Sequence, residues 1–393
     1  MDIFAKCAEF TDAKEAIASG YYPYFIPLTG NEGTQADFHG RRLIMCGSNN
    51  YLGLTTHPRV RAAAEEAIRK YGTSCTGSRF LNGTLEMHEQ LEHELAEWVG
   101  KQAALVFSTG MQVNLGAISA LVGRGDVVVL DKDDHASIVD GARLAWGETK
   151  RFRHNDMADL ERVLASIPEH KGRLVVIDGL YSMGGDIAPL PEIVPVCKKY
   201  GARLMVDDAH AMGVLGGGRG TAAHFNMTDD VDLIMSTFSK SFASLGGFIA
   251  GDADVIHYIK HHARSLIFSA SIPPANAAAA LAALEVMRSE PQRVARVMEI
   301  GEQMRRRYHA LGFNTLHSQT PIIPILIGDT MKTLFVWKAL FEAGVFVNPV
   351  ISPAVPQGME LLRTSYMATH TDEQLDCVME IFEQVGKAYG LVG

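Results

Sequence analysis

The sequence predicts an α/β protein with a large domain, whose sheet is flanked by helices, followed by a smaller α+β domain. Short, continuous apolar runs alternate with helical stretches over much of the chain. Continuous hydrophobicity is typical of strands covered on both faces, and strands that alternate with helices indicate an α/β architecture. The pattern changes near residue 280, and the length of 393 residues also favours more than one domain.

The large domain is expected over residues 51–280. A helix over 59–70 is rich in helix formers and stops at Tyr71-Gly72, and a second helix over 85–99 follows an Asn-Gly-Thr turn. Strands are then expected at the continuous apolar runs, which lie at 104–108, 126–131, 174–179, 203–208 and 233–238.

The smaller domain is expected over residues 281–393, and residues 1–50 are expected to pack with it. Its helices and strands alternate less regularly than those of the large domain, which predicts an α+β arrangement. The expected elements are a helix over 292–312, a strand over 321–327, a helix around 331–343, a strand over 361–367 and a final helix over 371–389.

Composition and charge exclude several classes of protein. The net charge of −9 argues against binding to a nucleic-acid backbone. The five cysteines form no CxxC pair and have no metal-ligand spacing, which is typical of reduced thiols in a cytosol. The N-terminal stretch MDIFAKCAEF lacks the apolar core of a signal peptide, and no apolar run reaches the ~18 residues that span a bilayer. We therefore expect a soluble cytoplasmic protein without a metal site.

The stretch TFSKSFASLGG at 237–247 places Lys240 among small and hydroxylated residues, directly after an apolar strand. Burial disfavours the ammonium form, so a lysine in such a place becomes available as a free amine. A free amine can form a Schiff base with an aldehyde. On this stretch alone, a surface lysine at the end of a strand is the stronger interpretation.

The stretch VDDAH at 206–210 places Asp207 and His210 at the end of another apolar strand. Ligands collect at the carboxyl ends of strands in open α/β sheets, and a buried carboxylate there needs a cationic partner. A protonated pyridine nitrogen is such a partner in pyridoxal phosphate (PLP) enzymes. Capping of the next helix by Asp207 or Asp208 is the alternative.

Two further stretches supply weaker signals. His135, in DDHASIVDG, has an imidazole that can lie flat on a pyridine ring, although a turn histidine bound to nearby backbone is as good an interpretation. The stretch FSTGMQVN predicts a strand, a glycine turn and a helix start, where the N–H groups of Gly110 and Met111 can hold a phosphate.

Together, these motifs occur in an order that resembles the α-oxoamine synthases. These are PLP enzymes of fold type I, which condense an amino acid with an acyl thioester and release carbon dioxide. The resemblance covers nearly the whole chain and includes SNNYLGL, GTSCTGSRFLNGT, HASIVDG, RFRHND, LYSMGGDIAPL, VDDAH, TFSKS, and LLRTS with the downstream ATHT. It implies a mostly parallel seven-stranded sheet in the large domain.

The resemblance assigns roles around the cofactor ring. Lys240 matches the Schiff-base lysine that acts as acid and base at the substrate Cα, and Asp207 matches the partner of the pyridinium nitrogen. His135 matches the histidine stacked on the ring. His210 and Ser182 match the pair near the O3′ oxygen of the ring.

The resemblance also assigns the phosphate and the substrate. The phosphate cradle is matched by Thr237, Ser239, the Gly110–Met111 turn and Ser269, which the family takes from the partner subunit of a homodimer. Arg363 matches the arginine that grips the substrate carboxylate, and Asn50 lies in a loop near that carboxylate.

Members of this family differ in their substrates. The amino acid is serine, alanine or glycine, and the closest resemblance is to the branch that joins L-serine to palmitoyl-CoA. The runners-up join alanine to a pimeloyl thioester or glycine to an acetyl group. A noncatalytic partner subunit is a different class of function, and the presence of Lys240, Asp207 and His135 argues against it. A plain transaminase, which needs no thioester, is a further alternative.

Overall fold

The computed structural model describes residues 2–393, which divide into two compact units. One unit is Asn49–Glu299, and the other joins the segment up to Ser48 with Ile300–Gly393. Helix α13 (Gln292–Leu311) carries the chain from the first unit into the second. The dividing point in the chain therefore lies at residue 300, later than the expected border at 280.

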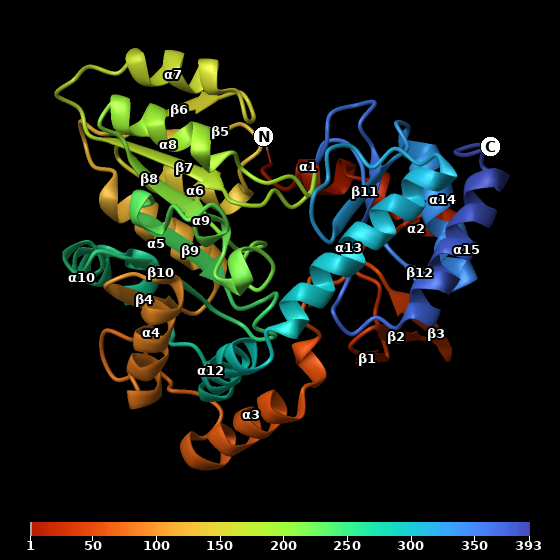
Figure 1. Cartoon of the computed structure of the whole chain (residues 1–393), viewed down its shortest axis with the longest axis horizontal. Coiled ribbons are helices and arrows are strands. Elements are labelled where there is room, and N and C mark those ends of the chain that lie inside the picture. Colours follow the sequence, from red (N-terminus) through yellow and green to blue (C-terminus); the bar gives the residue numbers. More distant parts are fainter. Residues whose placement is uncertain (1) are drawn as a thin grey trace. The chain divides into compact units, whose positions relative to one another are not determined.

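A seven-stranded sheet forms the centre of the larger unit (Figure 1), with strand order β4-β10-β9-β8-β7-β5-β6. Its strands are β4 (Ala103–Phe107), β5 (Val127–Asp131), β6 (Glu148–Phe152), β7 (Arg173–Asp178), β8 (Arg203–Asp207), β9 (Leu233–Thr237) and β10 (Gly247–Gly251). β10 runs antiparallel to both of its neighbours, β4 and β9, and all other neighbouring strands of this sheet pair in parallel. The other strands therefore end at one edge, where open α/β sheets bind ligands, and the predicted fold class is confirmed.

The strands predicted from apolar runs are all present, and the reason is burial on both faces. In β5 and β9 every residue is buried. The strands β6 and β10 were not predicted from such runs. β6 lies at the edge of the sheet and is largely exposed, so it lacks an apolar run. β10 begins and ends with glycine, which has a low strand propensity.

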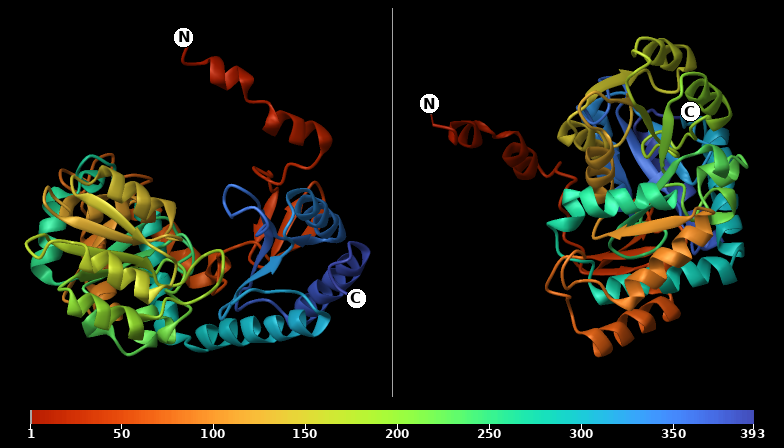
Figure 2. Two further views of the ribbon diagram at one scale, coloured as in Figure 1. Left: turned by 90° about the horizontal axis from the view of Figure 1, so that it is seen from above. Right: turned by 90° about the vertical axis from the view of Figure 1, so that its left-hand side faces the viewer.

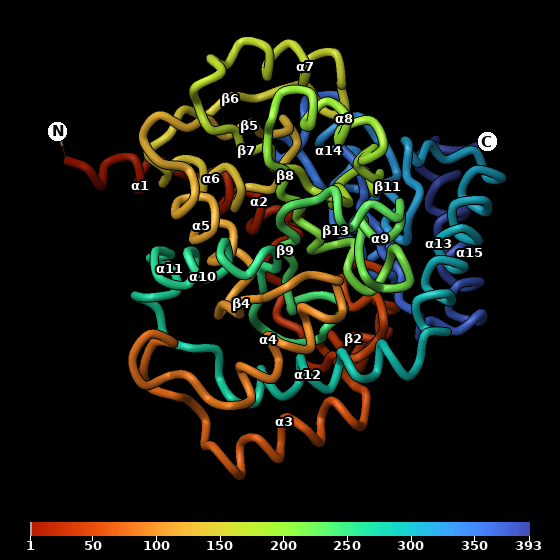
Figure 3. Tube along the Cα trace, turned by 60° about the vertical axis from the view of Figure 1, so that its left-hand side comes forward, coloured from red at the N-terminus to blue at the C-terminus, as the bar shows by residue number. Residues whose placement is uncertain are grey.

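Helices cover both faces of this sheet. The helices of the larger unit before α13 are α3 (Pro58–Tyr71), α4 (Glu86–Val99), α5 (Gly110–Leu121), α6 (Ala136–Leu144), α7 (Met157–Ala165), α8 (Leu190–Lys199), α9 (Thr221–His224), α10 (Ala253–His262), α11 (Arg264–Ile267) and α12 (Pro274–Ser289). One continuous apolar core joins α5, α6, α10 and α11 to the strands. Figure 3 shows α12 beside α3, and this packing keeps the chain beyond residue 280 in the larger unit.

The smaller unit contains two small sheets, with strand orders β1-β2-β3-β12 and β11-β14-β13. Its strands are β1 (Gly30–Glu32), β2 (Gln35–Phe38), β3 (Arg41–Met45), β11 (Ile322–Leu326), β12 (Val345–Phe346), β13 (Asn348–Val350) and β14 (Leu361–Ser365). The parallel pairing of β12 with β3 ties the N-terminal segment to the C-terminal part of this unit.

Helices complete the smaller unit, which includes most of α13. The others are α1 (Ala5–Glu9), α2 (Asp12–Ser19), α14 (Thr330–Ala343) and α15 (Asp372–Ala388). Neither α1 nor α2 buries a residue, and Figure 2 shows both projecting away from the sheets of this unit. Across residues 2–393, no helix is both long enough and apolar enough to cross a membrane.

Candidate active site

Lys240 lies in the connection between the antiparallel strands β9 and β10. The Phe238 amide donates a hydrogen bond to the Gly246 carbonyl at 2.9 Å, and the Ser244 amide donates one to the Phe238 carbonyl at 2.9 Å. These bonds close the turn that carries Lys240 at the end of β9. Its side chain is half-buried there, so the lysine lies at the ligand-binding edge of the sheet.

Asp207 ends β8 and is held by two donors. Its Oδ2 accepts a hydrogen bond from Asn114 Nδ2 at 2.7 Å, and its Oδ1 accepts one from the Ala209 amide at 2.9 Å. The side chain is 4% exposed. The neighbouring Asp208 accepts a hydrogen bond at 2.9 Å from the amide of Thr221, the first residue of α9. Asp208 therefore binds the N-terminus of α9, and the carboxylate of Asp207 stays at the edge of the sheet.

Asp178 ends β7 and is the register partner of Asp207 on β8. Burial raises the pKa of the Asp178 carboxyl well above its ordinary value, the charge of Asp207 raises it further, and the charge of Lys240 lowers it. Two buried carboxylates side by side repel each other, so the protonated form of one is favoured. The raised pKa of Asp178 therefore follows from burial and from this neighbour, and the positive charge of Lys240 opposes it.

A chain of hydrogen bonds leads from Asp207 to His135. Asn114 Nδ2 also donates to Ser137 Oγ at 2.8 Å, and Ser137 Oγ lies 2.8 Å from His135 Nδ1. The Ser137 amide donates to the same Nδ1 at 3.2 Å, so this nitrogen accepts a hydrogen bond from the backbone. His135 therefore caps α6, as the alternative of a turn histidine bound to nearby backbone predicted. The same contacts orient its exposed ring.

Gly110 begins α5 beside the end of β9. A Cβ atom at this position would lie 2.7 Å from Thr237 Oγ1 and 2.7 Å from Thr237 Cβ, so only glycine permits this approach. Thr237 Oγ1 lies 2.8 Å from Ser239 Oγ. Two hydroxyls thus stand beside the N–H groups of a helix N-terminus, which is a favourable anion site. Met111 follows on the first turn with its side chain half exposed.

Ser269 lies beside the same helix within one chain. Its Oγ accepts a hydrogen bond from Gln112 Nε2 at 2.7 Å. Ser108 Oγ donates to the Ala270 carbonyl and the Ser271 amide donates to the Gly77 carbonyl at 2.9 Å. The segment around Ser269 is therefore anchored close to the N-terminus of α5.

His210, Ser182 and Asn50 belong to the larger unit as well. His210 is 8% exposed, and its Nδ1 lies 2.7 Å from the hydroxyl of the fully buried Tyr51. Ser182 lies in a loop after β7 that an isolated bridge between Leu180 and Ile187 closes. Asn50 donates to Thr55 Oγ1 at 2.9 Å and accepts from the Leu54 amide at 3.0 Å.

Arg363 lies in β14 of the smaller unit, where it pairs in register with Pro324 of β11 and Asn348 of β13. The structure therefore links His135 to Asp207 through Asn114 and Ser137, and it places Gly110 beside Thr237 and Ser239. Arg363 belongs to the other unit.

Sequence reasoning missed three residues that shape this site: Asn114, Asp178 and Tyr51. Asp178 carried a usable signal, because it ends an apolar run in the same way as Asp207 does. Asn114 lies one helical turn after Gly110, so a polar residue there points towards the same sheet edge. The contact between Tyr51 and His210 had no signal in the sequence, because the two residues lie far apart in the chain.

A mostly parallel seven-stranded sheet with a lysine, two acids and a helix N-terminus at one edge is a fold-type I transferase architecture. The chain belongs to the aminotransferase class I and II family, whose sequence profile matches residues 41–382. The resemblance to the α-oxoamine synthases is confirmed by relatives that cover almost the full chain.

Two relatives and one solved structure illustrate this similarity. A serine palmitoyltransferase of Sphingobacterium spiritivorum is 51% identical over 383 residues, which cover 97% of this chain and 96% of that protein. An 8-amino-7-oxononanoate synthase of Thermoanaerobacter pseudethanolicus is 39% identical and covers 96% of both chains. The solved structure of a serine palmitoyltransferase variant from S. paucimobilis with a bound PLP–myriocin aldimine has a TM-score of 0.96, 36% identity and coverage of 100% of both chains.

Proposed function

We propose that this chain is a serine palmitoyltransferase. It condenses L-serine with palmitoyl-CoA and releases carbon dioxide and CoA, so that the product is 3-ketodihydrosphingosine. The observation that carries the proposal is the 51% identity to a serine palmitoyltransferase along 97% of this chain. The 8-amino-7-oxononanoate synthase, which is the second candidate, is less similar at 39% identity.

The residues at the sheet edge fit PLP as the cofactor. The close approach of Gly110 to Thr237, with Ser239 beside it, supports a phosphate at the N-terminus of α5. The Asp207 carboxylate, held by Asn114, supports a protonated ring nitrogen. When bound, PLP supplies an electron sink for the carbon whose bonds are broken.

The protein's own side chains then have distinct tasks. Lys240 anchors the cofactor and moves a proton at the substrate α-carbon. Asp207 would hold the proton on the ring nitrogen, and His135, whose orientation Ser137 sets, would lie against the ring. His210, which Tyr51 orients, shares the O3′ side of the ring with Ser182.

Arg363 is proposed to bind the serine carboxylate through two parallel hydrogen bonds, which a planar guanidinium provides. Asn50 is proposed to lie near the same carboxylate. Holding the carboxylate would fix the orientation of the bond that breaks relative to the cofactor. Both roles rest on the family resemblance of SNNYLGL and LLRTS.

Product analysis with a matrix of substrates tests the proposed function. Serine, alanine and glycine are each combined with palmitoyl-, pimeloyl- and acetyl-CoA, and CoA release and the product mass are measured. We expect serine with palmitoyl-CoA to give the highest kcat/KM. Preferred condensation of alanine with pimeloyl-CoA would instead assign the chain to the 8-amino-7-oxononanoate synthases, and an oxo acid formed without any thioester would indicate a transaminase.

We further propose that the enzyme is a homodimer whose two chains meet beside the phosphate cradle. Large apolar side chains stand exposed there on the larger unit: Phe80, Leu81, Met111 and Phe268. Gly77 and Ser271 join the two loops that carry most of them. Such a patch is typical of an interaction surface, and a second copy covering it would bring its own Ser269 towards the phosphate.

Sedimentation analysis tests the dimer. We expect twice the chain mass of 42.8 kDa at micromolar concentration, and we expect Phe268→Asp to shift the equilibrium towards the monomer. A fully active species with the mass of one chain would contradict the proposed dimer.

A further inference from the structure

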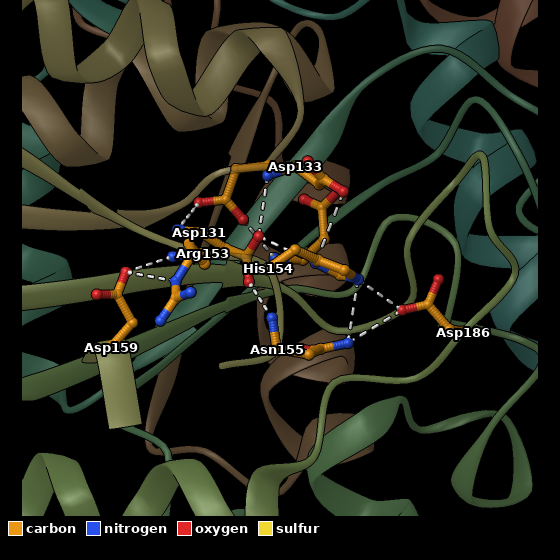
Figure 4. A network of polar contacts seen from close by, with 9 residues as sticks. Asp131, Asp133, Arg153, His154, Asn155, Asp159 and Asp186 are labelled. Atoms are coloured by element: carbon orange, nitrogen blue, oxygen red, sulfur yellow. Dashed lines mark hydrogen bonds and ion pairs between the residues drawn. The ribbon is translucent and has the colours of Figure 1, made fainter. Parts of the chain in front are cut away.

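His154 and Asn155 follow β6 and reach two acids from different parts of the larger unit (Figure 4). His154 Nδ1 lies 3.0 Å from Asp131 Oδ1, and its Nε2 lies 3.0 Å from Asp186 Oδ2. Asp131 ends β5, whereas Asp186 lies in the loop after β7. We call these four residues, Asp131, His154, Asn155 and Asp186, the clamp.

Both ring nitrogens of His154 face carboxylate oxygens, so both must donate. Only the protonated imidazole has two N–H donors. Burial lowers the pKa of His154, but the hydrogen bonds to Asp131 and Asp186 outweigh burial and raise the pKa to about 10. His154 is thus the cation between the acids of the clamp, with a third carboxylate, Asp133, 3.9 Å from Nδ1.

Asn155 makes the same connection with its backbone and side chain. Its amide donates to Asp131 Oδ2 at 3.1 Å, and its Nδ2 donates to Asp186 Oδ2 at 3.1 Å. Its φ of 50° is left-handed, a conformation that asparagine tolerates better than most residues. Two consecutive residues therefore tie the same two acids together.

Asp186 belongs to the loop that carries Ser182. The Tyr181 amide donates to the Asp186 carbonyl at 3.0 Å, and the Gly185 amide donates to the Tyr181 carbonyl at 2.9 Å. The His154 ring also packs edge-on against Tyr181, with ring centroids 4.4 Å apart. Asp131 is 1% exposed at the end of its strand, so it is a rigid anchor for this loop.

We propose that His154 and Asn155 are positioning residues, which fasten the Ser182 loop to the end of β5 and so place Ser182 in the cofactor site. The inference rests on the proposed function for the role of Ser182 beside the cofactor ring. The fastening itself follows from the contacts of the clamp.

The variants His154→Gln and Asp186→Asn break the clamp from its two sides, and Arg153→Gln is the matched control. Arg153 precedes His154 but is 71% exposed and pairs with Asp156, away from the loop. In the full-length holoenzyme, we expect both clamp variants to speed hydrogen exchange of the segment 180–187. We expect the dissociation constant of PLP to rise about 10-fold, since the loss of one hydrogen bond to a charged group weakens binding by about this factor. Arg153→Gln should change neither quantity.

A double-mutant cycle with Ser182→Ala separates positioning from general stabilisation. If His154 acts through Ser182, the losses in PLP affinity of His154→Gln and Ser182→Ala will not multiply in the double variant. Losses that multiply, or unchanged exchange of the loop in both clamp variants, would overturn the proposal. These readouts need no turnover. A chain that shows the expected effects of the clamp variants but condenses no serine therefore refutes the proposed function alone.

The charge of His154 predicts a pH dependence with a defined sign. Its pKa of about 10 in the folded protein exceeds the ordinary value of 6.5. The protonated ring therefore stabilises the fold fully below the ordinary pKa, and this contribution is lost as the pH rises through about 10. The groups that face the ring are Asp131, Asp133, Asp186, Asn155 and Tyr181.

Urea unfolding of the wild type and of His154→Gln measures this contribution. We expect the difference between their midpoints to be largest near about pH 6 and to shrink towards about pH 10. A difference that stays constant over this range would mean that His154 is not a charged member of the clamp.

Discussion

Replacing Lys240 with arginine is expected to lower the turnover of serine and palmitoyl-CoA by at least about 10³-fold. Arginine keeps the positive charge at the end of β9, but its guanidinium stays protonated in proteins. It therefore has no free lone pair with which to attack an aldehyde or to accept a proton from carbon. The turn that Phe238 and Gly246 close should stay intact, because its hydrogen bonds join backbone groups, including the bond from the Ala243 amide to the Lys240 carbonyl.

CoA release measures the turnover, and the visible absorbance of the bound cofactor reports whether the covalent anchor has formed. Lys199→Arg is the control, because Lys199 is an exposed lysine of α8 that pairs with Glu161. We expect the control to keep the wild-type rate and absorbance. Condensation at the native rate by Lys240→Arg would remove the lysine from the proposed chemistry.

Replacing Asp207 with asparagine is expected to lower turnover by about 10²-fold or more. An amide cannot form an ion pair with a protonated ring nitrogen, so the cofactor loses much of its power to accept electrons. The substitution also disturbs the local bonding, because both carboxylate oxygens accept hydrogen bonds, from Asn114 and from the Ala209 amide. An amide group offers only one acceptor oxygen, so one of these donors loses its partner.

Asp208→Asn is the matched control for Asp207→Asn, since the two acids are adjacent and both are buried. Burial raises the pKa of Asp208 to about 7, and its carboxylate holds the amide of Thr221 at the start of α9. We expect Asp208→Asn to lower the thermal midpoint while turnover stays close to that of the wild type. Equal losses of turnover in the two variants would mean that Asp207 has no special part in the chemistry. Thermal unfolding and steady-state kinetics of both variants decide the matter.

Much of the fold follows from local physical requirements that the sequence displays. A strand buried on both faces is apolar along most of its length, which is why β5, β7, β8 and β9 were visible as nearly continuous apolar runs that end in polar residues. The helices α13, α14 and α15 begin and end within one or two residues of their predicted bounds. The edge strand β6 escaped prediction because one side of it faces solvent.

Part of the candidate site could be predicted from the sequence for the same reason. Lys240, Asp207 and Gly110 each follow or end an apolar strand, and the ends of parallel strands meet at one edge of a sheet. Their neighbours were not visible. Asn114 and Asp178 reach Asp207 from a helix and from another strand, so their contacts depend on which strands lie side by side.

The sequence by itself determined the layered α/β class, most of the elements and the order of the chemical motifs, because these depend on local hydrophobicity, propensity and spacing. Only the tertiary structure decided which acid binds the N-terminus of α9, that Asp178 lies beside Asp207 with a raised pKa, and that His154 joins Asp131 to Asp186. Each of these depends on burial and on distances between side chains that lie far apart in the chain. Strand order and helix packing set those distances, and no local pattern records them.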